Sequence, residues 1–172
     1  MTLDRLWAGW RSTYIDSVTD GGPPAGDCVF CAILTSGLPP EETLVVWRGH
    51  RCAAVLNAYP YTSGHLMVMP VRHLGELASV NGQERVELWD AVHAGVAAVT
   101  AAYQPEGVNI GVNLGRAAGA GVPGHLHVHV LPRWSGDTNF MTTVAEARVL
   151  PEPLSRAREK LSAAWPALGD DA

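Results

Sequence analysis

Histidines at alternate positions are the strongest constraint that this chain places on its own fold. The stretch GHLHVHVLPRW, residues 124–134, contains His125, His127 and His129, each separated from the next by one aliphatic residue. In a β-strand, successive side chains point to opposite faces, so every second residue lies on the same face. The spacing therefore predicts a strand, reaching residue 131, with three imidazoles on one face and aliphatic side chains toward a hydrophobic core.

Three imidazoles on one face of a strand suit two kinds of site. They could bind a metal ion, or they could carry out proton-transfer or nucleophilic chemistry. The alternative without function is a chance cluster on an exposed strand. Three histidines in register favour a functional strand over that alternative.

The composition limits the class of protein. The chain has 172 residues, of which 47% are hydrophobic and 17% charged, as in an ordinary globular domain with a normal core. Its formal net charge of -5 argues against a basic face for nucleic acid. Apolar runs are too short to cross a membrane, and the N-terminal residues have no signal-peptide core. We expect one cytoplasmic domain over residues 1–172, with neither nucleic acid nor membrane as a partner.

Local patterns predict an α+β fold with a mostly antiparallel sheet. Besides the strand with the histidines, alternating segments predict strands at 43–48, 51–57, 65–70 and 107–114. Helical periodicity predicts helices at 3–14, 83–103 and 153–165, the last opening at a proline. Segments 139–144 and 147–150 are possible further strands. The core is expected from about residue 28 to about 140, with the N-terminal and C-terminal helices packed on it.

Two interpretations concern residues away from the histidine strand. The apolar face of helix 83–103 is predicted to contain Val86, Trp89, Val92, His93, Val96, Val99 and Tyr103. His93 is therefore interpreted as a packed or interfacial histidine rather than a ligand. Cys52 lies in an apolar strand and is interpreted as a small buried hydrophobic residue.

Cys28 and Cys31 form a C-x-x-C pair. In a reducing cytosol this pair indicates metal binding or redox activity rather than a structural disulfide. A closed tetrahedral zinc site needs two more ligands, and without a second C-x-x-C these must be histidines. Spacing alone leaves the choice open among His50, His65, His73, His93 and the histidines of the strand. Two free cysteines in an ordinary loop are the alternative.

The glycine-rich segment 115–124 runs directly into the histidine strand. Turns of this kind leave backbone N–H groups free to bind an anion, so a phosphate here would lie within reach of His127 and His129. Arg116 and Arg133 could add positive charge. A plain turn is the alternative, but the segment is long for a hairpin, which favours a ligand.

Several motifs together resemble a known family. The H-φ-H-φ-H-φ-φ pattern at 125–131 is similar to the signature of the histidine triad superfamily of nucleotide hydrolases and transferases. CVFC, VLNAYPYTSGHLMVMPVRH and NIGVNLGRAAG resemble its zinc loop, its G-H-containing strand and the turn before the triad. The resemblance covers most of the chain, from about Cys28 to about Phe140. HLHVHVLPRWSGDTNF is most similar to the branch of bacterial diadenosine tetraphosphate phosphorylases, also called ATP adenylyltransferases.

The resemblance implies a fold, an assembly and a role for individual residues. The fold would be a histidine-triad fold, a five-stranded antiparallel sheet with flanking helices, usually as a homodimer. His127 would be the nucleophile and His129 would contact phosphate. A structural zinc would be held by Cys28, Cys31, His73 and His125. The nucleotide would be bound by Asn57, Asn113, Gly119, Ala120, Gly121, Val122 and Trp134.

The implied reaction is cleavage of a dinucleoside polyphosphate at an α-phosphorus through a nucleotidyl-histidine. Inorganic phosphate is the favoured second acceptor, which makes the chain a phosphorylase acting on adenine nucleotides. Alternatives are a hydrolase of dinucleoside polyphosphates or nucleoside phosphoramidates, a purine-nucleotide-binding regulatory protein, or a site where all three imidazoles bind one catalytic metal. One residue departs from the family pattern: Gly121 stands where related chains carry a hydroxyl that assists the leaving group.

Overall fold

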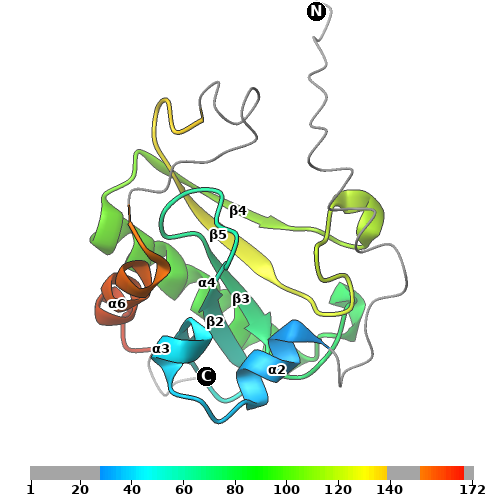
Figure 1. Ribbon diagram of the computed structural model, residues 1–172. Helices are drawn as coiled ribbons and strands as arrows, with labels where there is room; N and C mark the ends of the chain where they lie inside the picture. The colour runs from blue at the N-terminus through cyan, green and yellow to red at the C-terminus, as the bar shows by residue number, and fades with distance from the viewer. Residues whose placement is uncertain (1–27, 139–151, 169–172) are drawn as a thin grey trace, which may run out of the picture.

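The computed structural model describes residues 28–138 and 152–168 (Figure 1). The helix expected at 3–14 and the strands considered at 139–144 and 147–150 lie outside these residues. Within them, no helix is both long and apolar enough to span a membrane.

A five-stranded sheet forms the centre of the molecule, in the order β1-β2-β3-β5-β4. Every neighbouring pair of strands is antiparallel. The strands are β1 (Val45–Arg48), β2 (Cys52–Leu56), β3 (Leu66–Pro70), β4 (Gly107–Val112) and β5 (Val128–Arg133). All five expected strands are present, which confirms the α+β prediction with an antiparallel sheet.

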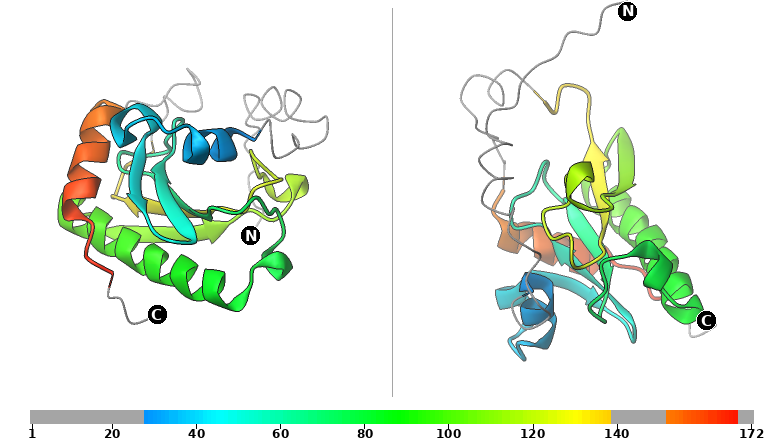
Figure 2. Two further views of the ribbon diagram at one scale, coloured as in Figure 1. Left: turned by 90° about the horizontal axis from the view of Figure 1, so that it is seen from below. Right: turned by 90° about the vertical axis from the view of Figure 1, so that its right-hand side faces the viewer.

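Helices cover the sheet on both faces (Figure 2). The short helices α2 (Val29–Thr35) and α3 (Pro40–Thr43) lie on one side, and α4 (Gly82–Tyr103) lies on the other. Helix α6 (Leu154–Ala164) packs against α4 and β1. The sheet is therefore the middle layer of a three-layer arrangement.

Strands β2 and β3 are buried on both faces, which explains their continuous apolar sequences. Alternate residues of each strand contribute to two separate cores. The core on the α4 side includes Cys52, Ala54, Leu56, Leu66 and Val68. The core on the α2 side includes Ala53, Val55, Met67 and Met69, together with Phe30 and Leu34 of α2. The fully buried position of Cys52 confirms its interpretation as a small hydrophobic residue.

The start of α4 is fixed to the segment that follows β3. Asn81 and Glu84 form a capping box, in which each side chain accepts a hydrogen bond from the other residue's backbone N–H. The buried Glu84 carboxylate also accepts two hydrogen bonds from the Arg72 guanidinium. Because Arg72 adjoins His73, these contacts anchor the loop that carries this histidine.

The buried face of α4 differs from the expected one. Val86, Trp89 and His93 are exposed, so His93 is not packed among the described residues, and its interpretation as an interfacial histidine stays a prediction. The residues that face the sheet are Leu88, Ala91, Val92, Ala94, Gly95, Ala98 and Val99. Small side chains allow a close approach: a Cβ at Gly95 would lie 3.2 Å from the Leu66 side chain. Of the expected face, Val92 and Val99 are buried as predicted, whereas the larger Trp89 is exposed.

Strand β4 lies at one edge of the sheet and pairs, within the described residues, with β5 alone. Its sequence GVNIGV has no charged residue and no proline, the features that usually protect an edge strand from further pairing. Ile110 in its centre is 47% exposed. Among the described residues, nothing pairs with the outer edge of β4.

Candidate active site and metal centre

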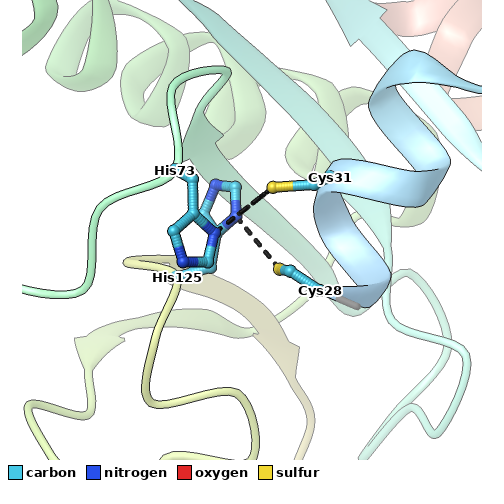
Figure 3. Close-up of side chains that lie close together, drawn as sticks. All are labelled: Cys28, Cys31, His73 and His125. Atoms are coloured by element: carbon cyan, nitrogen blue, oxygen red, sulfur yellow. Dashed lines mark hydrogen bonds between the residues drawn. The ribbon is translucent and has the colours of Figure 1, made fainter. Parts of the chain in front are cut away.

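Four side chains from three segments meet at the start of α2 (Figure 3). Cys28 caps α2 and Cys31 lies in its first turn, so the C-x-x-C pair lies at a helix start rather than in the expected loop. Cys28 Sγ lies 3.4 Å from His125 Nδ1, and Cys31 Sγ lies 3.3 Å from His73 Nδ1. The four potential ligand atoms all lie within 4.8 Å of one another, so this Cys2His2 group could hold one metal ion.

The second nitrogen of His125 fixes which nitrogen faces the cysteines. His125 Nε2 lies 2.8 Å from the carbonyl oxygen of Pro70 and donates its proton to it. Its Nδ1 is then the nitrogen with a lone pair, and it points at both thiols. A metal-binding histidine typically donates its other N–H to a carbonyl in this way. The chemistry of this donor set therefore fits a metal ion, and one histidine of the triad belongs to it.

Contacts between two loops bring His73 and His125 together. The backbone N–H of Leu126 donates to the Leu74 carbonyl at 2.6 Å. Gly75 allows the loops to touch, because a Cβ there would lie 2.7 Å from the Pro123 oxygen. The two imidazole rings consequently lie edge to face with centroids 5.3 Å apart.

His127 is buried and its tautomer is fixed by the backbone. Its Nδ1 lies 2.8 Å from the carbonyl oxygen of His125, which can only accept a hydrogen bond. Nδ1 therefore carries the proton and Nε2 carries the lone pair. Burial lowers the pKa of His127, although the hydrogen bond to the carbonyl opposes this effect. The result is a neutral imidazole with an available nitrogen, as a nucleophile requires.

His129 lies next to His127 on β5, with ring centroids 4.9 Å apart. Its Nδ1 is 3.0 Å from His65 Nε2, and its buried Nε2 has no hydrogen-bond partner among the described residues. Burial, together with the nearby His127, lowers the pKa of His129 to about 4. The prediction that the three histidines share one side is confirmed, because Leu126, Val128 and Val130 all contribute to the core on the α4 side.

The strand itself begins later than the spacing predicts. Regular pairing of β5 starts at Val128, so His125 and His127 lie in the segment that leads into the strand. Phe30 of α2 packs on both rings, with centroids 5.5 Å from His125 and 5.2 Å from His127. Sequence spacing gave no signal for Phe30, because its role depends on where α2 lies on the sheet.

The glycine-rich turn lies directly before these histidines. Gly115 and Gly119 adopt positive φ angles of 76° and 87°, which glycine accepts without strain. The side-chain amide of Asn113 donates to the Gly119 carbonyl at 3.4 Å and helps to hold the turn. The amides of Gly119 and Ala120 donate within the turn to Arg116 and Gly115.

Two amides of the turn remain available to a ligand. Within the described chain, the N–H groups of Gly121 and Val122 donate to no backbone carbonyl. The carbonyl of Val122 accepts from the His125 amide, so these two N–H groups lie only a few residues from the triad. Of the turn residues considered from the sequence, Gly121 and Val122 are therefore the ones whose amides could meet an anion.

Two residues considered for the site lie elsewhere. Trp134 follows the far end of β5, five residues or about 16 Å of extended chain beyond His129. Its ring packs on Tyr103, with centroids 6.4 Å apart. Arg133 binds both carboxylate oxygens of Asp137 and also the side chain of Asn109. The structure does not bring Trp134 to the triad of its own chain, and the described partners of Arg133 are Asp137 and Asn109.

The side chain of Asn57, which is expected to bind the nucleotide, contacts His65 in the structure. Asn57 Nδ2 is 3.3 Å from His65 Nδ1, and Asn57 Oδ1 accepts from the Tyr59 amide. His65 was considered from the sequence only as a possible zinc ligand. Instead it is fully buried and adjoins His129, a position that spacing could not reveal.

A Cys2His2 group beside two buried neutral imidazoles, on a five-stranded antiparallel sheet, defines the class of a histidine triad fold. The family model of the HIT domain matches residues 40–136. The chain therefore belongs to the HIT domain family. This confirms the family that the sequence motifs indicated.

Relatives and solved structures agree with this family. AP-4-A phosphorylase of Mycobacterium tuberculosis is 39% identical over 165 residues, covering 95% of this chain and 85% of its own. The asymmetrical bis(5'-nucleosyl)-tetraphosphatase of Schizosaccharomyces pombe is 32% identical over 98 residues, covering 57% of this chain and 53% of its own. A Zn-bound histidine triad family protein from Mycobacterium smegmatis has a TM-score of 0.64 and 27% identity, covering 83% of this chain and 95% of that one.

The lowered pKa of His129 predicts how stability depends on pH. An unfolded histidine takes up a proton near pH 6.5, whereas folded His129 does so only near its pKa of about 4. Between these values the unfolded chain binds more protons, so the free energy of unfolding falls as the pH falls. We expect His129 to contribute up to about 1 kcal/mol per pH unit to this slope. Urea unfolding of wild type and His129→Gln at pH 7, 6 and 5 measures it, and equal slopes would contradict the assignment.

Proposed function

We propose that this protein cleaves dinucleoside tetraphosphates at an α-phosphorus through a nucleotidyl-His127 intermediate, and that inorganic phosphate is the second acceptor. The observation that carries the proposal is the tautomer of His127, whose Nε2 keeps its lone pair in a buried site. The relative named AP-4-A phosphorylase, similar over almost the entire chain, supports the substrate class and the acceptor.

The first step transfers a nucleotidyl group to the protein. Nε2 of His127 attacks the α-phosphorus, a P–N bond forms, and the P–O bond to the remaining nucleotide breaks. From diadenosine tetraphosphate this step releases ATP and leaves AMP on His127. N–H groups stabilise the charge on the phosphoryl oxygens, and we assign this role to His129, Gly121 and Val122. Asn57, which contacts His65, and Asn113, which contacts the turn, are the residues that we expect to bind the nucleotide.

The second step decides between phosphorolysis and hydrolysis. An oxygen of inorganic phosphate attacks the nucleotidyl phosphorus, the P–N bond breaks, and ADP leaves. Among the described residues, Trp134 packs on Tyr103 and Arg133 binds Asp137, so we assign the donors for this phosphate to the turn rather than to these two side chains. Water is the second candidate acceptor, favoured by the relative named as an asymmetrical tetraphosphatase.

Zinc is the metal that the Cys2His2 group suits best. Ligand atoms around tetrahedral zinc lie about 3.3 to 3.8 Å apart, given Zn–S near 2.3 Å and Zn–N near 2.0 Å. The S···N distances of 3.3, 3.4 and 3.6 Å fall in this range. Four protein ligands leave no open position, so zinc here would be structural, holding α2 against the loops of His73 and His125.

The proposal also covers the assembly and the cellular location of the protein. We expect a homodimer in the cytoplasm. The outer edge of β4, which no other described strand pairs with, supports self-association, because a second copy could pair with it.

One zinc ion per chain is the first expected result. Metal analysis of the purified protein should give one equivalent, and Cys31→Ser should lose it along with about 3 kcal/mol or more of unfolding free energy. Cys52→Ala is the matched control, since Cys52 is buried away from the cluster and its loss should leave the zinc content unchanged. Full zinc content in Cys31→Ser would overturn the ligand set.

His127→Asn should abolish turnover and keep nucleotide binding. The substitution removes the nucleophilic nitrogen but leaves a polar side chain, so we expect turnover to fall by more than about 10³-fold. Steady-state kinetics and calorimetric binding of a non-hydrolysable dinucleotide measure the two effects. The control is His93→Asn, at an exposed position on α4, which should behave as wild type. Near-normal turnover of His127→Asn would rule out the nucleophile.

The products identify the acceptor. With diadenosine tetraphosphate and phosphate, we expect ADP and ATP in equal amounts, and omission of phosphate should stop the turnover. Separation of the nucleotides by chromatography gives the answer. AMP and ATP, formed at a rate indifferent to phosphate, would make the protein a hydrolase.

A further inference from the structure

We propose that His65 is a positioning residue that fixes the tautomer of His129, so that His129 presents an N–H to the substrate while His127 presents a lone pair. The inference deepens the proposed function, because it rests on the role of His129 at the phosphoryl oxygens. It follows from a chain of hydrogen bonds whose directions can be assigned one after another.

The series of hydrogen bonds begins at Tyr61, whose backbone N–H lies 3.2 Å from His65 Nδ1. A backbone N–H can only donate, so His65 Nδ1 must accept. The amide of Asn57 agrees with this direction. Its Oδ1 accepts from the Tyr59 N–H at 2.9 Å, which turns its Nδ2 group toward His65 Nδ1 at 3.3 Å. Two donors therefore face the same nitrogen of His65.

His65 consequently carries its proton on Nε2. That atom lies 3.0 Å from His129 Nδ1, so His65 donates and His129 Nδ1 accepts. A doubly protonated His65 would direct an N–H against the Tyr61 amide, and His65 is fully buried, where a charge is costly. The direction of the hydrogen bond between the two histidines is thereby set from the backbone of residues 57–65.

The last group in this series of hydrogen bonds is the Nε2–H of His129. With Nδ1 as an acceptor, a neutral His129 must carry its proton on Nε2. This atom is buried and has no acceptor among the described residues. A buried donor without a partner is costly, so it indicates an unmet ligand. The partner that suits it is an anionic oxygen, such as one on a phosphoryl group.

The two adjacent imidazoles thus have opposite tautomers. His127 is protonated on Nδ1 by its bond to the His125 carbonyl, whereas His129 is protonated on Nε2. Without His65, His129 could turn a lone pair toward the phosphate and repel it. The ring of Tyr61 packs over both His65 and His129, with centroids at 4.6 and 6.3 Å, and restricts their rotation.

The test reads the tautomers directly, in the complete zinc-loaded protein without substrate. In ¹⁵N-histidine-labelled protein, protonated and unprotonated ring nitrogens give well-separated shifts, and long-range ¹H–¹⁵N spectra identify each tautomer. We expect Nε2–H for His65 and His129, and Nδ1–H for His127. A His129 protonated on Nδ1, or on both nitrogens at neutral pH, would overturn the inference. Because no turnover is needed, this outcome is independent of whether the proposed reaction is correct.

A pair of variants separates tautomer control from simple packing. Gln at position 65 can still donate an amide N–H toward His129, whereas Leu cannot. We expect His65→Leu to lower kcat about tenfold or more with little change in KM, and His65→Gln to recover most of the loss. His93→Leu is the control. Equal losses in both variants, or full activity of His65→Leu, would contradict the proposal, and the wild-type spectrum decides if His65→Leu does not fold.

Discussion

The site depends on His125. Its side chain belongs to the Cys2His2 group, and its backbone carbonyl holds the imidazole of His127. Its Nδ1 faces both cysteines, and its Nε2 donates to the Pro70 carbonyl. Its own carbonyl accepts the Nδ1–H of His127. The same residue therefore completes the metal-binding group and selects the nitrogen of His127 that can attack. A change in the position of His125 would therefore disturb both the metal-binding group and the tautomer of His127.

Burial without charge is the second constraint. Burial lowers the pKa of His125, of His127 and of His129, so the three imidazoles remain neutral together. Three imidazolium ions in this space would repel one another, whereas neutral rings can each be assigned a donor and an acceptor. The surrounding carbonyls and amides then determine which ring nitrogen carries the proton. These contacts depend on the fold, so the sequence alone does not reveal them.

Much of the fold could be predicted because it depends on local alternation. All five strands were predicted, and the residues between the histidines lie in the core, since a strand with one polar face has few other options. The helix start at Cys28 and the face of α4 were not predicted, because close packing of small residues such as Gly95 overrides the larger apolar pattern. His65 was missed as a partner of His129, because their contact joins segments 64 residues apart.

The covalent intermediate is the most direct test of the account. Full-length protein would be mixed with diadenosine tetraphosphate in the absence of phosphate, quenched under alkaline conditions that preserve phosphorus–nitrogen bonds, and digested for mass spectrometry. We expect one AMP group on the peptide that contains His127, and we expect this group to be lost when phosphate is added before the quench. An adduct on another residue, or turnover with no adduct and unchanged rates in His127→Asn, would contradict it.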